Sequence, residues 1–138
     1  MAATILGSRQ HTALPLAGGT LTGVVKHTNT TTTPSGASPS ATIDLNVGNH
    51  QILACTSATG TIGITLTVPT ANKPSAGTIL VKIHATTATG ITFAASSGTL
   101  YWLGTQPTWT GLTPGKRLRI SWAYDGTDLD LAATDVNS

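Results

Sequence analysis

Apolar and polar residues alternate one by one over much of the chain from residue 41 onward. The alternation is clearest in 61–68 and 117–124, where every second residue is aliphatic or aromatic. Because successive side chains of a strand point to opposite faces of a sheet, this period predicts strands with one buried face. Other segments follow the same rule more briefly. The predicted strands are 41–47, 50–55, 61–68, 78–85, 91–94, 100–103, 117–124 and 127–132.

Turn-forming residues separate these strands at short intervals. Gly48-Asn49 and residues 57–60 are turn signals, and Asp125-Gly126 is a strong hairpin signal. We find no segment with a convincing helical period. Short strands divided by frequent turns are typical of β-sandwiches. The sequence therefore predicts an all-β fold, a jelly-roll-like β-sandwich over residues 41–138.

The chain before this domain has a different character. Residues 1–12 are polar apart from a few apolar side chains and predict an extended N-terminal arm. Residues 13–40 are rich in Gly, Pro and Thr and predict a hinge followed by an extended linker at 28–40, after a short strand at 21–27. Within 13–23, leucines surround a proline and two glycines, an arrangement too broken for a helix. Such an apolar stretch needs a surface from other chains.

The hinge also carries a recognisable element. Residues 14–23 read Leu-Pro-Leu-Ala-Gly-Gly-Thr-Leu-Thr-Gly, which resembles an element of bacteriophage fibre, spike and head-decoration proteins. The resemblance implies a trimeric virion protein, and we expect a parallel homotrimer at the virion surface. Because the N-terminus lacks a signal-peptide pattern, we expect assembly in the host cytoplasm. The residues that we expect to attach the chain to the virion or to its copies are Ile5, Leu6, Leu14, Pro15, Leu16, Gly18, Gly19 and Leu21.

Composition agrees with a β-rich domain and restricts the partners. Charged residues are 9% of the chain, all five acids are Asp, and the net charge is +2. Lys116, Arg117 and Arg119 form the basic cluster, which we interpret as a solvated strand face. A nucleic-acid groove would need more basic residues interleaved with aromatics. Attraction to an anionic glycan or an acidic protein surface stays open. We expect Asp128 and Asp130 opposite Arg119 and Arg117 on the polar face.

Catalytic patterns do not emerge from the sequence. Asp128 and Asp130 read as a salt-bridged surface rather than a glycosidase acid pair. Neither a Gly-x-Ser-x-Gly elbow nor a Walker spacing occurs. We therefore expect no enzymatic activity and no cofactor. The hypothesis of a polysaccharide-degrading enzyme is disfavoured, because the sequence lacks a convincing acid pair.

Metal and thiol chemistry is similarly limited. The histidines lack ligands at metal-binding spacing, although His27 or His50 could meet its copies on a three-fold axis. Cys55 has no partner for an intrachain disulfide, and we expect it to be a small buried hydrophobe. No apolar run predicts membrane insertion, and the N-terminus lacks a signal-peptide pattern.

Aromatic residues give the remaining candidate contacts. Tyr101, Trp102 and Trp109 bracket a long loop at 104–115. They could contact a glycan or a protein partner, or they could pack in the core and the trimer. Trp122 alternates with core residues, and we expect it in the interior.

These observations favour a non-enzymatic virion protein. The first hypothesis is a trimeric decoration, cement or head-fibre protein, whose N-terminal arm docks onto the major capsid protein or another virion protein. The alternative is a short tail fibre or spike tip that binds a host surface glycan.

Overall fold

The computed structural model describes residues 29–70, 74–83, 88–107 and 114–135. This part of the chain is all-β, which confirms the predicted class, and it contains ten strands and no helix. The strands are β1 (Asn29–Thr32), β2 (Ser35–Ala37), β3 (Ser40–Asp44), β4 (His50–Cys55), β5 (Ser57–Thr67), β6 (Ser75–Ile83), β7 (Ala88–Ala95), β8 (Leu100–Trp102), β9 (Arg117–Tyr124) and β10 (Leu129–Asp135).

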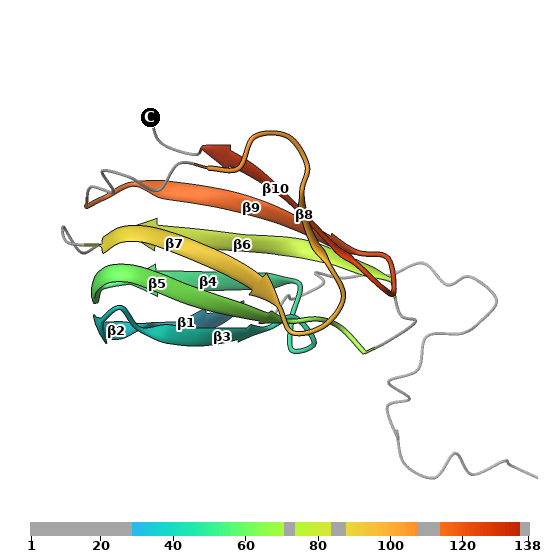
Figure 1. Cartoon of the computed structure of the whole chain (residues 1–138), viewed down its shortest axis with the longest axis horizontal. Helices are drawn as coiled ribbons and strands as arrows, with labels where there is room; N and C mark the ends of the chain where they lie inside the picture. The colour runs from blue at the N-terminus through green and yellow to red at the C-terminus, as the bar shows by residue number, and fades with distance from the viewer. Residues whose placement is uncertain (1–28, 71–73, 84–87, 108–113, 136–138) are drawn as a thin grey trace, which may run out of the picture.

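The strands form two sheets that face each other as a sandwich (Figure 1). The first sheet has six strands in the order β1-β4-β6-β9-β10-β8. The second sheet is built around β5, which pairs with β2, β3 and β7. Because β3 and β7 both pair with residues 63–66 of β5, they lie on its opposite edges.

The chain crosses between the sheets at almost every step from β1 to β7. The strands β1, β4 and β6 are neighbours in the first sheet, and β3, β5 and β7 are neighbours in the second. All these neighbours are parallel. Their register places Asn29 level with His50, and His50 level with Thr78, which means directly opposite on the neighbouring strand. This part of the chain therefore winds as a flattened coil.

This winding corrects the jelly-roll expectation. A jelly roll consists of Greek keys with antiparallel strands. In the described part of the chain, six of the eight strand pairs are parallel, and only β6–β9 and β9–β10 are antiparallel. The sequence did not reveal this because alternation reports which face is buried, not the direction of the neighbouring strand.

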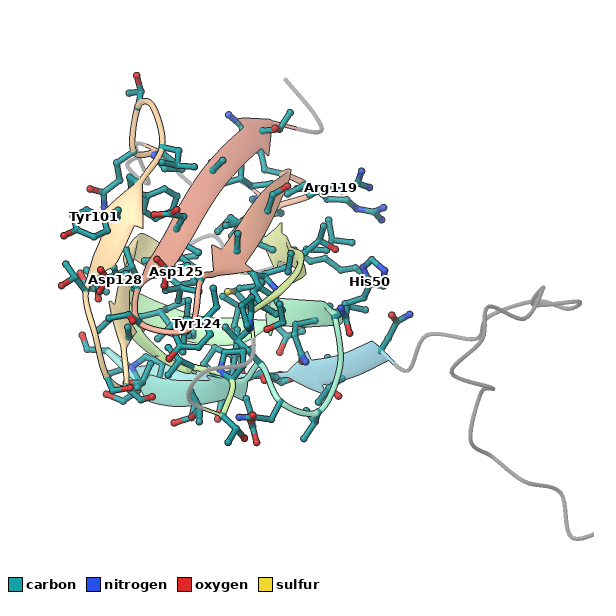
Figure 2. All side chains as sticks on the ribbon, turned by 90° about the vertical axis from the view of Figure 1, so that its right-hand side faces the viewer. His50, Tyr101, Arg119, Tyr124, Asp125 and Asp128 are labelled. Carbon is teal, nitrogen blue, oxygen red and sulfur yellow. The ribbon has the colours of Figure 1, made fainter. Side chains whose placement is uncertain are left out.

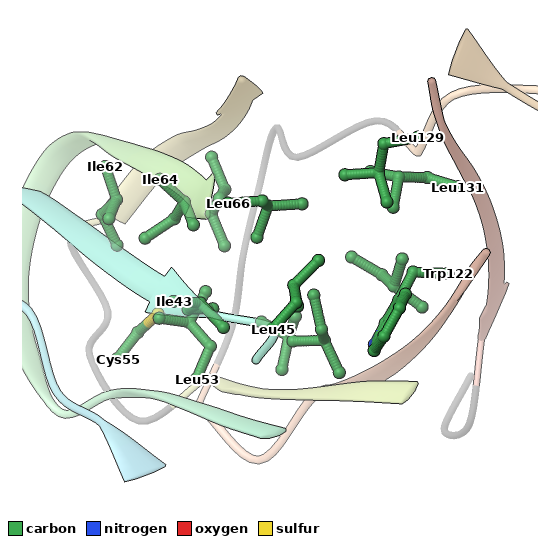
Figure 3. Close-up of a cluster of buried hydrophobic side chains, with 14 of the residues drawn as sticks. Ile43, Leu45, Leu53, Cys55, Ile62, Ile64, Leu66, Trp122, Leu129 and Leu131 are labelled. Carbon is green, nitrogen blue, oxygen red and sulfur yellow. The ribbon is translucent and has the colours of Figure 1, made fainter. Parts of the chain in front are cut away.

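The inner faces of the two sheets enclose a single hydrophobic cluster (Figure 3). Predicted strand faces are confirmed, since alternating residues of β5, β6, β9 and β10 are buried. Trp122 is only 2% exposed, as predicted for the interior. The largest buried side chains are Ile43, Leu53, Ile62, Ile64, Leu66, Ile79, Ile91, Ile120, Leu129, Leu131, Gln51 and Val81.

Val47 was expected on the buried face with Ile43 and Leu45, but it is 51% exposed. The strand β3 ends at Asp44, whose Oδ1 accepts hydrogen bonds from the Asn46 backbone N–H (2.9 Å) and side-chain amide (2.7 Å). Asp commonly starts a turn by binding the backbone two residues later. The turn breaks the period of two before Val47.

Residues 29–40 contain strands, although the sequence predicted a linker there. They form β1 and β2, which pair with β4 and β5. Threonine is β-branched and favours pleated strands, so the Thr-rich run suits an edge strand. The turn predicted at 57–60 also belongs to a strand, because β5 begins at Ser57. Gly60 has a φ of 69° where the β5–β7 register shifts, so this glycine accommodates an irregularity within the strand.

A substitution at Gly77 tests the close packing around β6 and β9. It lies level with Trp122, and an added Cβ would meet the Asn49 carbonyl oxygen and approach Cζ2 of the Trp122 ring to 2.7 Å. We expect Gly77→Ala to lower the free energy of unfolding by about 1–3 kcal/mol, measured by urea denaturation. The control is Gly63→Ala, where the nearest atom would be Ser40 Oγ at 3.6 Å. Equal losses in both variants would contradict this packing.

Candidate functional site

The outer face of the six-stranded sheet carries a shallow hollow over β1, β4, β6 and β9. Its volume is about 310 Å³, near the lower end of the range of about 300–1,000 Å³ for small-molecule sites. The hollow is lined by Asn29, His50, Gln51, Ile52, Thr78, Leu80 and Arg119.

Strand register arranges these residues in two adjacent rows. Asn29, His50 and Thr78 lie level across β1, β4 and β6 and form a polar row. In the next row, Ile52 of β4 is level with Leu80 of β6, and Leu80 is level with Arg119 of β9. This row therefore consists of two apolar side chains and one cation. Nδ1 of His50 lies 2.7 Å from Oγ1 of Thr78, a hydrogen bond that orients both side chains. The hollow therefore combines polar groups, an apolar floor and a positive charge.

Gln51 contributes to the wall of the hollow, but its side chain serves the fold. It is 2% exposed, and its Nε2 donates to the carbonyl oxygens of Asp44 (3.2 Å) and Gly48 (2.9 Å). These bonds tie the turn between β3 and β4 to the start of β4. Its Oε1 is buried without a hydrogen-bond partner in the described structure.

Positive charge gathers on the same outer face. Lys82 of β6 is level with Arg117 of β9 and extends the predicted cluster of Lys116, Arg117 and Arg119. Both arginines and Lys116 are exposed, and none of these four cations forms an ion pair with a described residue. Figure 2 shows the side chains of His50 and Arg119 projecting to the same side of the sandwich. The cluster is therefore available to an external anion.

The expected pairing of Asp128 and Asp130 with the arginines is wrong. Asp130 is level with Ala123, whereas Arg119 is level with Thr134. Tyr124 pairs with Leu129, so the Asp125-Gly126 signal lies in the loop 125–128 that joins β9 and β10 as an antiparallel hairpin. Asp128 accepts a hydrogen bond from the Thr99 backbone N–H at 2.8 Å. Asp128 lies away from His50 and Arg119 (Figure 2).

Asp125 stabilises the loop between β9 and β10. Its Oδ1 accepts hydrogen bonds from the backbone N–H groups of Asp128 (2.8 Å) and Thr127 (2.7 Å). These bonds favour the ionised form, and they lower the pKa of the Asp125 carboxyl below its ordinary value. A carboxylate held in this way is suited to shaping a turn rather than to donating a proton.

The predicted aromatic contacts are separated by the fold. Tyr101 points away from the core and is 50% exposed. Trp102 is next in β8 and faces the other way, with its ring centroid 6.1 Å from that of Phe93 at an interplanar angle of 72°. Trp102 therefore takes the packing role that the sequence left open. Trp109 lies outside the described residues.

The predicted attachment residues between Ile5 and Leu21 also lie outside the described residues. So does His27, one of the two histidines considered for a three-fold metal site. The other, His50, lies in the hollow. Within the described part of the chain, no group of three or more His, Cys, Asp or Glu side chains could hold a metal ion. No helix in that part is long and apolar enough to cross a membrane.

Sequence reasoning missed the hollow. Its residues come from four strands that are distant along the chain, and only Arg119 belonged to a cluster visible in the sequence. The parallel alignment of β1, β4 and β6 brings them together. A regular repeat of strands and turns along the sequence would have predicted the coil. The turns are unequally spaced, so the sequence shows no such repeat.

Cys55 is buried in the core, as predicted, and desolvation raises the pKa of its thiol to about 11. The unfolded thiol, with a pKa of about 9.0, ionises first as the pH rises. The contribution of Cys55 to stability is therefore complete below pH 9 and is lost as the pH rises through 11. We expect the unfolding free energy to fall more steeply in this window for the wild type than for Cys55→Ala, by up to about 1.4 kcal/mol per pH unit. Parallel pH profiles in chemical denaturation would contradict this expectation.

Comparison with protein-family models, curated proteins and solved structures finds no match for the chain.

Proposed function

We propose that the chain is a non-enzymatic structural protein of a bacteriophage particle. It acts as a trimeric decoration, cement or head-fibre protein, whose N-terminal arm docks onto the capsid and whose β-domain protrudes. The observation that carries this proposal is the Leu-Pro-Leu-Ala-Gly-Gly-Thr-Leu-Thr-Gly element at 14–23. Its resemblance to phage fibre and decoration proteins links the chain to a virion.

The position of β1 supports an attachment role for the preceding segment. The strand β1 is at an edge of the six-stranded sheet, and residues 1–28 precede it. The segment that contains the ten-residue element therefore joins the sandwich at one sheet edge.

The opposite edge of this sheet offers a surface for contact between copies. The strand β8 lies at that edge, and Tyr101 and Leu103 are 50% and 58% exposed there. An open strand edge with exposed apolar side chains favours association. In the proposed trimer, β8 and the 14–23 element both contribute contacts.

Light scattering of the full chain tests the trimer. We expect a mass three times that of the 14.0 kDa chain, and we expect Leu103→Arg to shift the population towards monomer because it places a charge in the contact. Val47→Arg is the matched control, since Val47 is 51% exposed in the turn after β3. A monomeric wild type would refute the trimer, and equal effects of the two variants would refute the contact at β8.

Particles lacking the protein test the role on the virion. We expect mass spectrometry of purified wild-type particles to detect the chain in a copy number divisible by three. Particles from a phage without the gene should lose infectivity faster on heating, because the stabilising contacts are absent, and should adsorb normally to host cells. Absence of the protein from wild-type particles would overturn the proposal.

The alternative is a short tail fibre or spike tip that recognises a host surface glycan. Exposure of Tyr101 on the outside of the sandwich favours this reading, because a tyrosine offers an apolar face and a polar tip. The same deletion separates the two functions. Lost adsorption with normal heat resistance would support the alternative.

A further inference from the structure

We propose that the hollow on the outer face of the six-stranded sheet binds a carboxylated sugar. The Arg119 guanidinium holds the carboxylate, the row of Asn29, His50 and Thr78 binds hydroxyl groups, and Ile52 and Leu80 support the sugar ring. This binding activity goes beyond a structural role on the virion, because cementing and trimer assembly do not require it.

The charge distribution selects an anionic ligand. Arg119 lines the hollow, and Arg117 and Lys82 form a level pair beside it on the same face. These cations form no ion pair with a described residue. Guanidinium groups bind carboxylates through two parallel hydrogen bonds, which gives both strength and orientation.

The neighbouring apolar pair selects an organic ligand over a simple anion. Ile52 and Leu80 are level partners in β4 and β6, and both are half-buried. Their exposed portions lie next to Arg119 in the same row. A pyranose ring presents C–H groups on its faces and can cover this apolar floor, whereas an inorganic anion would leave it exposed to water.

The polar row supplies groups that match sugar hydroxyls. A carboxamide, an imidazole and a hydroxyl side chain lie level on three adjacent strands. Together they contain both hydrogen-bond donors and acceptors. The 2.7 Å hydrogen bond between His50 and Thr78 sets the orientation of that pair before a ligand arrives, which reduces the entropy lost on binding.

The lining disfavours single-stranded nucleic acid. Sequence-tolerant binding of single strands relies on aromatic side chains on which bases stack. His50 provides a ring in this hollow, and no Trp, Tyr or Phe is among the described residues that line it. The combination of one lining guanidinium, an apolar floor and a short polar row fits an acidic sugar better.

Titration calorimetry with the full chain tests the site. One probe is a tetrasaccharide that alternates glucuronic acid and N-acetylglucosamine, and a second is a sialylated trisaccharide. We expect at least one of them to bind saturably, and the one that binds identifies the kind of acidic sugar. The glucuronic acid probe with its carboxyl groups reduced to alcohols, or the trisaccharide without sialic acid, should bind at least tenfold more weakly.

Two variants with the same change in net charge locate the binding. Arg119→Gln removes the cation from the hollow, whereas Arg117→Gln removes a cation that is on the same strand but does not line it. We expect at least a tenfold loss of affinity for the first and less than a threefold loss for the second, with unchanged thermal unfolding in both. Equal losses would show diffuse attraction to the basic face and overturn the site.

Three further results would also overturn the proposal. The first is that neither acidic saccharide binds saturably to the wild type, and the second is that the neutral counterpart binds as tightly as the acidic probe. Competition by inorganic phosphate at the same concentration as the saccharide would assign the hollow to simple anions instead. Thr78→Val removes a hydroxyl group from the polar row of the hollow and leaves Arg119 in place. We expect this variant to bind the saccharide more weakly, and that result would support the proposal.

Discussion

The fold depends on closing two sheets that each have a single apolar face. An apolar sheet face must be covered by another element, and here the inner faces of β5 and β6 belong to opposite layers of one core. Burying an aliphatic side chain contributes about 1.5–3 kcal/mol. A shift of one residue in any of these strands would turn its apolar side chains to solvent. The register is therefore strongly constrained.

The same constraint arranges the outer surface. When Gln51 and Leu53 of β4 face inward, His50 and Ile52 must face outward, and parallel pairing sets them beside Thr78 and Leu80 of β6. Packing of β9 against β6 then adds Arg119 to the apolar row. The hollow and its basic rim thus follow from the pairing that builds the core. They require no special loop, and the rigid sheet holds their geometry.

Much of the architecture could be predicted from local pattern. The strand bounds of β4 and β9, and the buried faces of β5, β6 and β10, follow directly from alternation. Predictions failed where a local signal competed with pairing. The Thr-rich 29–32 segment became β1 because an edge of β4 was open to it, and Gly60 became part of β5. The opposition of Arg119 and Asp128 failed because a hairpin that turns after Tyr124 pairs Arg119 with the far end of β10, where it lies opposite Thr134.

By itself, the sequence determined the all-β class, the inward faces of the long strands, the burial of Cys55 and Trp122, and the presence of a basic cluster. These properties depend on period and composition, which are local. Only the tertiary structure decided that the chain coils between two sheets with mostly parallel neighbours, that Trp102 faces Phe93, and that His50 and Arg119 share one hollow. Those properties depend on which distant strands become neighbours. Alternation carries no information on that choice, because a strand of either direction buries the same face.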